Sequence, residues 1–343
     1  MTAVALVGFG RNGRNLFRAL YRREGISIAA IADPAPPESL LYLLRFDTLL
    51  GRLPDPAELA GGELSVAGRR TRVLSGAQAD ATPWAELGVH TVLEATSKTR
   101  TREELHRHLA AGAARVISLA PPPPNEDPDL LSVPGITDDR IESRQRIVSN
   151  ASATVHCVAP VLRILADRFG LRRAMFTTAH AYTSFQHLAD APAEDLRGGR
   201  AAAENIIPQA SRSPSMLARV LPDLAARVSA YAMNVPVQNG SVVDLVCWHE
   251  RPVSVESVNE AVRAAADSPR WRRLLDYERD PIVSSDVATT RCSAVFDSLA
   301  TMTLGDRMSK TLTWFGAGCG YAERAVELLE RFAEADRRPG AAA

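Results

Sequence analysis

The first 33 residues constrain the fold more than any other part of the chain. An apolar run at 3–7 leads into the turn G-F-G-R-N-G at 8–13, and an amphipathic segment follows. A second apolar run at 26–31 then ends beside Asp33. Strand, glycine turn, helix and strand at this spacing are typical of a dinucleotide-binding unit.

The glycines of the turn have separate roles. Gly8 permits the tight bend, Gly10 lets the backbone approach a pyrophosphate, and Gly13 allows close packing of the helix, whose N-terminus attracts negative charge. Asp33 lies about twenty residues past Gly13. A carboxylate there accepts hydrogen bonds from the adenosine ribose and repels a 2′-phosphate, which favours NAD over NADP.

The pattern of strands and helices continues beyond this unit. Apolar strands are predicted at 92–96 and 115–121, with a helix at 102–111 between them. This alternation predicts an α/β protein with a mainly parallel sheet. The prolines at 121–124 predict a stiff loop. With 343 residues, 46% of them hydrophobic, the chain is long enough for two ordinary domains.

Composition narrows the function classes. Forty basic residues balance forty acidic ones, so nothing favours nucleic acid or an anionic membrane as a partner. No apolar run approaches a membrane span, and the start of the chain lacks a basic region before its apolar run, which predicts a cytoplasmic protein. The four cysteines are scattered without a C-x-x-C pair, which argues against a metal site or a disulfide framework.

The segment S-N-A-S-A-T-V-H-C at 149–157 resembles the S-N-A-S-C-T-T-N-C signature of glyceraldehyde-3-phosphate dehydrogenases. Other segments that resemble this family are G-F-G-R-x-G-R at 8–14, T-A-H-A-Y-T at 178–183, R-G-G-R at 197–200, E-N-I-I-P at 204–208, V-P-V at 235–237, S-V-V-D-L at 241–245 and I-V-S-S-D at 282–286. The chain is therefore identified as a member of this family from about residue 3 to about residue 335.

The resemblance implies a domain organisation. A Rossmann-type NAD-binding domain is expected at 1–149, and an α+β catalytic domain of the glyceraldehyde-3-phosphate dehydrogenase type at 150–316. The segment 317–343 is expected to pack back on the first domain, and its residues 322–335 repeat apolar side chains at helical spacing. A homotetramer is also implied.

The nucleophile of the family is missing. Ala153 occupies the position of the first cysteine of the signature, which attacks the substrate aldehyde in the family, and only the second, Cys157, remains. Because an alanine methyl cannot add to a carbonyl, covalent acyl transfer is impossible at this position. His180 matches the catalytic histidine; without a thiol it is either a general base or hydrogen-bond donor, or a relic held by packing.

Other departures affect the ligand sites that the resemblance implies. The family asparagine that binds the nicotinamide carboxamide corresponds to Ala317. At the substrate phosphate site T-A-T-Q-K becomes T-S-F-Q-H at 183–187, so Phe185 replaces a hydroxyl, and the family arginine becomes Asn234. Losing that fixed charge removes bidentate phosphate binding. The new substrate is therefore expected to be larger, less anionic and able to stack on Phe185.

The predicted site residues fall into two sets. Those expected at the dinucleotide are Gly8, Gly10, Arg11, Asn12, Gly13, Asp33, Thr96 and Ala317. Those expected at the substrate are Ser152, Thr154, Thr183, Phe185, His187, Ser211, Arg212 and Asn234, with Ser152 and Thr154 retained from the family's inorganic phosphate site. His156 is interpreted as a packed helix histidine or a catalytic group, and Cys319 as a buried thiol or a replacement nucleophile.

Three functional hypotheses follow. The first is an enzyme of altered chemistry in specialised metabolism, with NAD as cofactor in a hydride transfer without covalent intermediate, or with an NAD-derived metabolite as the substrate. The second is an engineered cysteine-to-alanine variant of an NAD-dependent aldehyde dehydrogenase of the glyceraldehyde-3-phosphate type. The third is a non-catalytic dinucleotide-binding pseudoenzyme.

Overall fold

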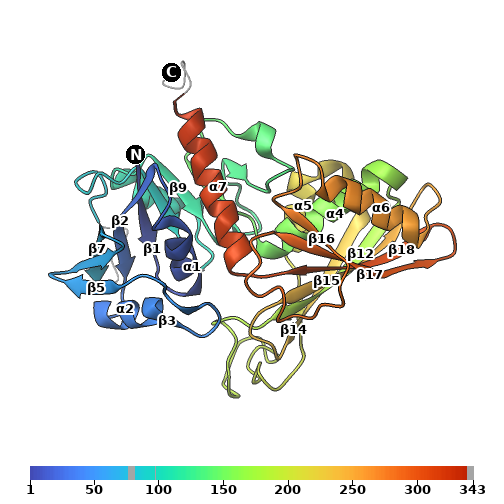
Figure 1. Cartoon of the computed structure of the whole chain (residues 1–343), viewed down its shortest axis with the longest axis horizontal. Coiled ribbons are helices and arrows are strands. Elements are labelled where there is room, and N and C mark those ends of the chain that lie inside the picture. Colours follow the sequence, from blue (N-terminus) through green and yellow to red (C-terminus); the bar gives the residue numbers. More distant parts are fainter. Residues whose placement is uncertain (76–81, 97, 338–343) are drawn as a thin grey trace. The chain divides into compact units, whose positions relative to one another are not determined.

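The chain forms two units in this computed structural model (Figure 1). The described residues are 1–75, 82–96 and 98–337. Unit 1 comprises Met1–Ser132, Thr137–Ser152 and the chain from Ala322 onward, and unit 2 comprises Val133–Ile136 and Ala153–Tyr321.

Unit 1 is built on a nine-stranded sheet of order β10-β11-β9-β8-β1-β2-β7-β6-β5. The strands are β1 (Thr2–Val7), β2 (Ile26–Asp33), β5 (Ala57–Ala60), β6 (Glu63–Val66), β7 (Arg69–Ser75), β8 (Thr91–Glu94), β9 (Arg115–Ser118), β10 (Leu130–Leu131) and β11 (Ile147–Ser149). The pairings from β10 to β7 are parallel, and only β5, β6 and β7 pair antiparallel within this sheet. This confirms the predicted parallel sheet.

The central strands of this sheet are buried on both faces. Every residue of β8 and β9 is buried, as expected for parallel strands covered by helices on both sides. The helices of unit 1 are α1 (Arg11–Leu20), α2 (Pro37–Arg45), α3 (Arg102–Ala110) and most of α7 (Cys319–Ala335), with a 3₁₀ turn at Asp138–Arg140 and a small hairpin of β3 (Phe46–Asp47) and β4 (Gly51–Arg52). The strand order reverses between β1 and β8, so this point of the carboxyl edge is where an open parallel sheet binds ligands.

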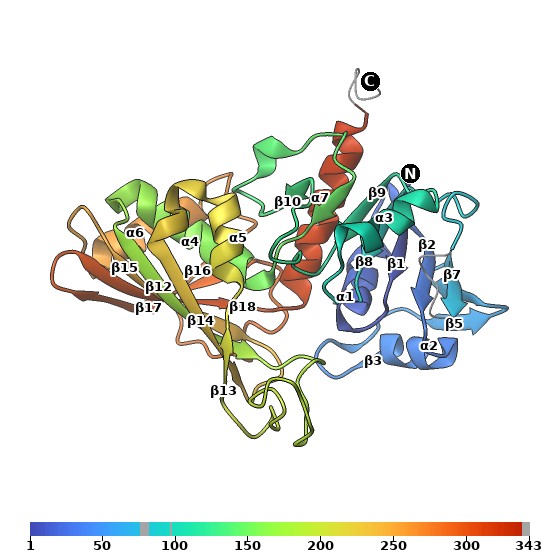
Figure 2. The same ribbon diagram turned by 180° about the vertical axis from the view of Figure 1, so that it is seen from behind.

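Unit 2 contains a mixed seven-stranded sheet of order β13-β14-β12-β15-β18-β17-β16. Its strands are β12 (Arg173–Ala181), β13 (Ile207–Ala210), β14 (Val228–Val235), β15 (Ser241–Trp248), β16 (Leu275–Glu278), β17 (Ala294–Leu304) and β18 (Met308–Phe315). Helices α4 (Ala153–Phe169), α5 (Ser213–Val220) and α6 (Val255–Ala266) lie along one face of the sheet, and a 3₁₀ turn covers Pro222–Arg227 (Figure 2). Buried and half-buried residues alternate along β18, as expected for a sheet with one covered face.

Within the described part of the chain, no helix combines the length and the apolar character needed to span a membrane.

Candidate functional site

The glycine turn of unit 1 is shaped by close backbone contacts. Gly8 has a φ of +86°, and a Cβ there would lie 2.7 Å from the Cα of Thr96. A Cβ at Gly13 would lie 2.1 Å from the carbonyl oxygen of Gly8. A Cβ at Gly10 would meet no atom within 4 Å, so the space beside this backbone is open. The turn therefore combines two positions restricted to glycine with one open face at the start of α1.

Asp33 is fixed beside this turn. Its Oδ2 accepts a hydrogen bond from the Phe9 N–H at 2.6 Å, and its Oδ1 accepts one from the Ala35 N–H at 2.9 Å. Each carboxylate oxygen has a second lone pair, so the side chain can still accept hydrogen bonds from ribose hydroxyls. Arg11 and Asn12 are half-buried in the first turn of α1.

Four residues of the candidate site lie in strand order along the carboxyl edge of the sheet. Asp33 ends β2, Gly8 follows β1, Thr96 follows β8 and Ser118 ends β9. Since adjacent strands are about 4.8 Å apart, this row extends over roughly 14 Å. A dinucleotide whose adenosine ribose met Asp33 would extend over β1 toward Thr96. The open space at Gly10 and the position of Asp33 therefore fit NAD.

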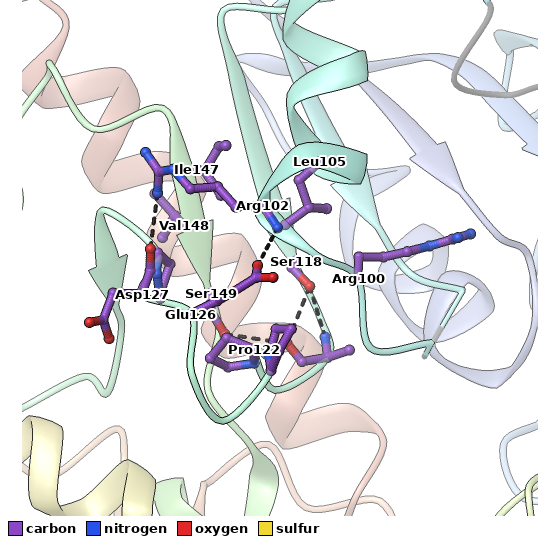
Figure 3. Close-up of a pocket in the computed structure, with 13 residues that line it drawn as sticks. Arg100, Arg102, Leu105, Ser118, Pro122, Glu126, Asp127, Ile147, Val148 and Ser149 are labelled. Atoms are coloured by element: carbon purple, nitrogen blue, oxygen red, sulfur yellow. Dashed lines mark hydrogen bonds between the residues drawn. The ribbon is translucent and has the colours of Figure 1, made fainter.

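A small pocket lies at the ends of β9 and β11 (Figure 3). Ser118 and Ser149 both donate hydrogen bonds to the carbonyl oxygen of Ala120, at 3.2 and 3.3 Å. Arg102 pairs with Asp129 at 2.6 Å. These polar groups hold the loop that encloses the pocket. Sequence analysis missed the pocket, although the prolines at 121–124 supply part of its wall.

The turn before α4 has an unusual backbone. Ala151 is fully buried and has a φ of +48°, a conformation that costs a non-glycine residue about 1 kcal/mol or more. Its N–H donates to the Ser149 Oγ at 3.2 Å. Strained backbone often occurs where a turn presents a reacting side chain. The first residue of the helix is the half-buried Ala153, which presents only a methyl group.

His180 has a defined tautomer near the end of β12. Its Nδ1 lies 2.6 Å from the Ala181 carbonyl oxygen, so this nitrogen carries the hydrogen and donates. In the neutral ring Nε2 is then an acceptor. Burial lowers the pKa of His180, and the bond to Ala181 only partly opposes this shift. The side chain is therefore suited to accept a proton at Nε2.

Asn234 lies beside His180 in the parallel register of β12 and β14. It is only 4% exposed, and its Nδ2 has no hydrogen-bond partner among the described residues. An unpaired buried amide costs about 1–3 kcal/mol, so this group indicates a binding position for an acceptor. Ile207 pairs with Asn234, and Arg212 follows the opposite end of β13.

The segment 183–187 forms a compact turn. The N–H and hydroxyl of Thr183 both donate to Gln186 Oε1, at 2.7 and 2.8 Å. The Phe185 N–H donates to the Thr183 Oγ1 at 3.3 Å. The Thr183 hydroxyl thus stabilises the turn. Phe185 is 57% exposed and His187 is also exposed, so both rings are accessible for contacts.

The remaining predicted substrate residues lie at helix starts. Thr154 is buried in the first turn of α4, and Ser152 is half-buried just before it. Ser211 accepts a hydrogen bond from the Ser213 N–H at 3.2 Å. This bond supports the start of α5.

Ala317 is held by a residue that sequence analysis missed. Its N–H donates to the Asn239 Oδ1 at 3.4 Å, while the Asn239 amide donates to the Ala288 carbonyl oxygen at 2.8 Å. Gly240 has a φ of +78°, so the N-G pair at 239–240 was the available signal for this turn. Asn239 thus fixes the loop that carries Ala317 but does not replace the missing side-chain amide.

His156 and the cysteines have ordinary packing environments. His156 is buried, with its ring 5.6 Å from that of Tyr321. Burial raises the pKa of Cys157 far above its usual range and that of Cys247 to about 12. Cys319 is half-buried at the first residue of α7. In the described part of the chain, no group of three or more histidine, cysteine or acidic residues could hold a metal.

Comparison with known proteins gives consistent matches over both units. Residues 2–102 match the family model "Glyceraldehyde 3-phosphate dehydrogenase, NAD binding domain", and residues 152–317 match the model of the C-terminal domain. The chain is 40% identical over 333 residues to a glyceraldehyde-3-phosphate dehydrogenase of Mycobacterium avium, covering 95% of this chain and 97% of the relative. It is 39% identical over 326 residues to that of Geobacillus stearothermophilus, covering 95% and 96%. It is also 39% identical over 327 residues to that of Streptomyces coelicolor, with the same coverage.

Proposed function

Because the chain belongs to the glyceraldehyde-3-phosphate dehydrogenase family, with an NAD-binding domain and NAD as its cofactor, we propose that it is an oxidoreductase of altered chemistry. In this proposal the reaction forms no covalent cysteine intermediate, and the substrate is not a triose phosphate. The observation that carries the proposal is Ala153, which begins α4 where the family nucleophile is expected. We assign the substrate to specialised metabolism and the protein to the cytoplasm.

His180 supplies the acid–base chemistry in this proposal. NAD, when bound, would supply the acceptor for a hydride that leaves a carbon of the substrate. The Nε2 of His180 accepts the proton of the hydroxyl on the same carbon, so that an alcohol or aldehyde hydrate becomes a carbonyl compound. A neutral imidazole whose Nδ1 is already bonded to Ala181 supports this role. No thiol is needed for this step.

Asn234 and Phe185 support a different substrate. The unpaired amide of Asn234 can donate to a carbonyl or hydroxyl oxygen, but it carries no charge to match a phosphate. Phe185 is exposed and could contact a planar or apolar group. These features favour a substrate that is larger and less anionic than a triose phosphate.

Ala317 favours a second candidate, in which an NAD-derived metabolite is itself the substrate. The family asparagine side chain is absent there, and glycines occupy positions 316 and 318. A methyl group at position 317 takes less space than an asparagine side chain, which favours a modified nicotinamide end. Comparing the turnover of NAD with that of nicotinamide-modified analogues tests this candidate.

We also propose that the protein is a homotetramer. Trp248, Met308 and Leu304 are neighbours across β15, β18 and β17, on the face of the sheet opposite the helices. Trp248 is 48% exposed and Leu304 is 73% exposed. Apolar residues grouped in this way favour association with another chain of the same kind.

Restoration of the nucleophile tests the altered chemistry. The chain with Ala153 should release no NADH from glyceraldehyde 3-phosphate, inorganic phosphate and NAD, because Ala153 cannot form the thiohemiacetal. Ala153→Cys alone should restore little activity, whereas Ala153→Cys with Phe185→Thr and Asn234→Arg should restore more, because the phosphate anchor returns. NADH absorbance measures the rates, and saturation with NAD checks cofactor binding in each variant. Full activity of the single variant would support the engineered-variant hypothesis, and NAD binding without turnover on any substrate would support the pseudoenzyme.

A further inference from the structure

A series of buried polar side chains, each in contact with the next, lies beside the glycine turn of unit 1. The Trp84 Nε1–H donates to the His108 Nδ1 at 3.2 Å. The His108 Nε2 lies 3.6 Å from the Glu94 Oε2. The Glu94 Oε1 accepts hydrogen bonds from both the N–H and the hydroxyl of Thr96, the first at 3.0 Å. Trp84, His108 and Glu94 are each less than 5% exposed.

Trp84 fixes which groups donate and which accept hydrogen bonds in this series of side chains. An indole nitrogen only donates, so the His108 Nδ1 must accept. In the neutral ring the hydrogen is then on Nε2, the nitrogen that faces Glu94. The tautomer of His108 thus follows from the position of Trp84, and the nitrogen that carries the hydrogen is the one 3.6 Å from the carboxylate.

Packing of the core does not explain a carboxylate at position 94, because its burial is unfavourable. Glu94 is 1% exposed at the end of the buried strand β8, and Trp84 belongs to an apolar cluster with Val7 and Val92. Burying a carboxylate is costly unless hydrogen bonds compensate for its lost hydration. The bonds that Glu94 accepts come from the residue two positions later, so its carboxylate shapes the chain just beyond β8.

Thr96 connects this series of side chains to the glycine turn. A Cβ on Gly8 would lie 2.7 Å from the Thr96 N and 2.9 Å from its Cγ2, so the two backbones touch. The Ala95 N–H donates to the Val7 carbonyl oxygen at 2.7 Å. Glu94 binds both donors of Thr96, which holds this contact at the point where the strand order reverses.

We propose that Glu94 and His108 are positioning residues for NAD. Through Thr96 they set the backbone at the β1–β8 edge against which the dinucleotide binds. This inference rests on the proposed placement of NAD at Gly8 and Thr96. Loss of either group frees Thr96 to rotate, which changes the edge against which the dinucleotide binds.

Calorimetric titration with NAD tests the proposal on the full chain. Glu94→Gln keeps the side-chain shape, and Trp84→Phe keeps an aromatic ring but removes the indole N–H; each should weaken NAD binding by about tenfold, within the range of coupling between contacting residues. In a Thr96→Ala background, Glu94→Gln should have a smaller effect on the NAD dissociation constant, because the hydroxyl bond to Glu94 is gone and only the backbone N–H bond remains. Thr71→Val is the matched control, since it removes another buried bond in unit 1, from the Thr71 Oγ1 to the Ile28 carbonyl oxygen at 2.9 Å.

The outcomes distinguish failure of the positioning role from failure of the proposed NAD binding. Thr71→Val should lower the unfolding midpoint without changing the NAD affinity. If Glu94→Gln and Trp84→Phe also lower only the midpoint, or weaken NAD equally with and without Thr96→Ala, the positioning role is wrong. If the wild-type chain itself does not bind NAD, the proposed NAD function fails first. Should Glu94→Gln not fold, Trp84→Phe alone decides, because it leaves the carboxylate and Thr96 in place.

Discussion

The Ala181 carbonyl oxygen determines which nitrogen of His180 can react. It accepts the hydrogen bond of Nδ1, which lies 2.6 Å away, and burial of the ring lowers the pKa of His180 below its ordinary value of 6.5. If His180 is the general base, His180→Ala should lower turnover by about two to four orders of magnitude. His180→Gln should fail to restore it, because an amide cannot accept the proton. An undiminished rate in His180→Ala would contradict this role.

The pH dependence follows from the same shift. The neutral base is present above its lowered pKa, so the acid limb of turnover should lie below pH 6.5. His180 also affects stability, because the unfolded chain takes up a proton at a higher pH than the folded chain does. The free energy of unfolding should therefore decrease as the pH falls from about 6.5 toward the folded pKa.

Some site residues could be predicted because the local backbone conformation requires a particular residue type. Gly8 and Gly13 were expected to be glycines required by the turn, and the structure explains why, since a Cβ at either position would overlap neighbouring backbone. Glu94 and Asn239 were missed because their partners are set by the three-dimensional fold. A buried glutamate at a strand end looks in sequence like any exposed one. The unpaired amide of Asn234 also required the pairing of β14 with β12 to become visible.

Helix α7 is attached to unit 1 by pairs that are remote in sequence. Arg115 is buried, and its guanidinium binds both carboxylate oxygens of Asp336, at 2.8 and 2.9 Å. The same guanidinium lies 4.0 Å from the ring of Phe332. Arg23 pairs with Glu323 at 2.6 Å near the start of the helix. The apolar repeat predicted this helix, but no local pattern could have predicted ion-pair partners 221 residues apart.

Removal of the charge of Asp336 tests this attachment. Asp336→Asn keeps the shape but leaves the buried Arg115 without its charged partner. Because Asp336 is itself partly exposed, the loss should be about 1–2 kcal/mol, less than for a fully buried pair. Chemical denaturation measures the free energy of unfolding. Asp267→Asn, in an exposed pair of α6, is the control and should change it by less than about 0.5 kcal/mol.

The two units differ in how much of their sheet topology could be predicted from the sequence. The parallel sheet of unit 1 follows from the repeated strand–helix pattern and from the rule that crossovers cover both faces. In unit 2, β12 pairs with both β14 and β15, and β14 also pairs with β13, so the strand order depends on pairings that local patterns do not encode. There the family resemblance carried the prediction, and the matched C-terminal domain model confirms the family.

The exposed face of this second sheet makes the assembly testable. Met175, Val246, Lys310 and Met302 form a row across four strands, next to the row that contains Trp248. The Lys310 Nζ pairs with the Asp244 Oδ2 at 2.9 Å, so the charge in this apolar face is already matched. A second copy of the chain could cover this face without leaving Lys310 unpaired.

Charge introduced into this face should disrupt assembly. Trp248→Asp should convert the proposed homotetramer into smaller species, because a carboxylate would be buried without a partner at the contact. Arg168→Asp places the same residue at the exposed end of α4, a helix that lies on the other face of the sheet, and should leave the assembly intact. Sedimentation velocity measures the mass of each species, and circular dichroism checks that both variants fold. A wild-type chain that sediments as a monomer, or a Trp248→Asp variant that keeps the tetramer, would place the contact elsewhere or remove it.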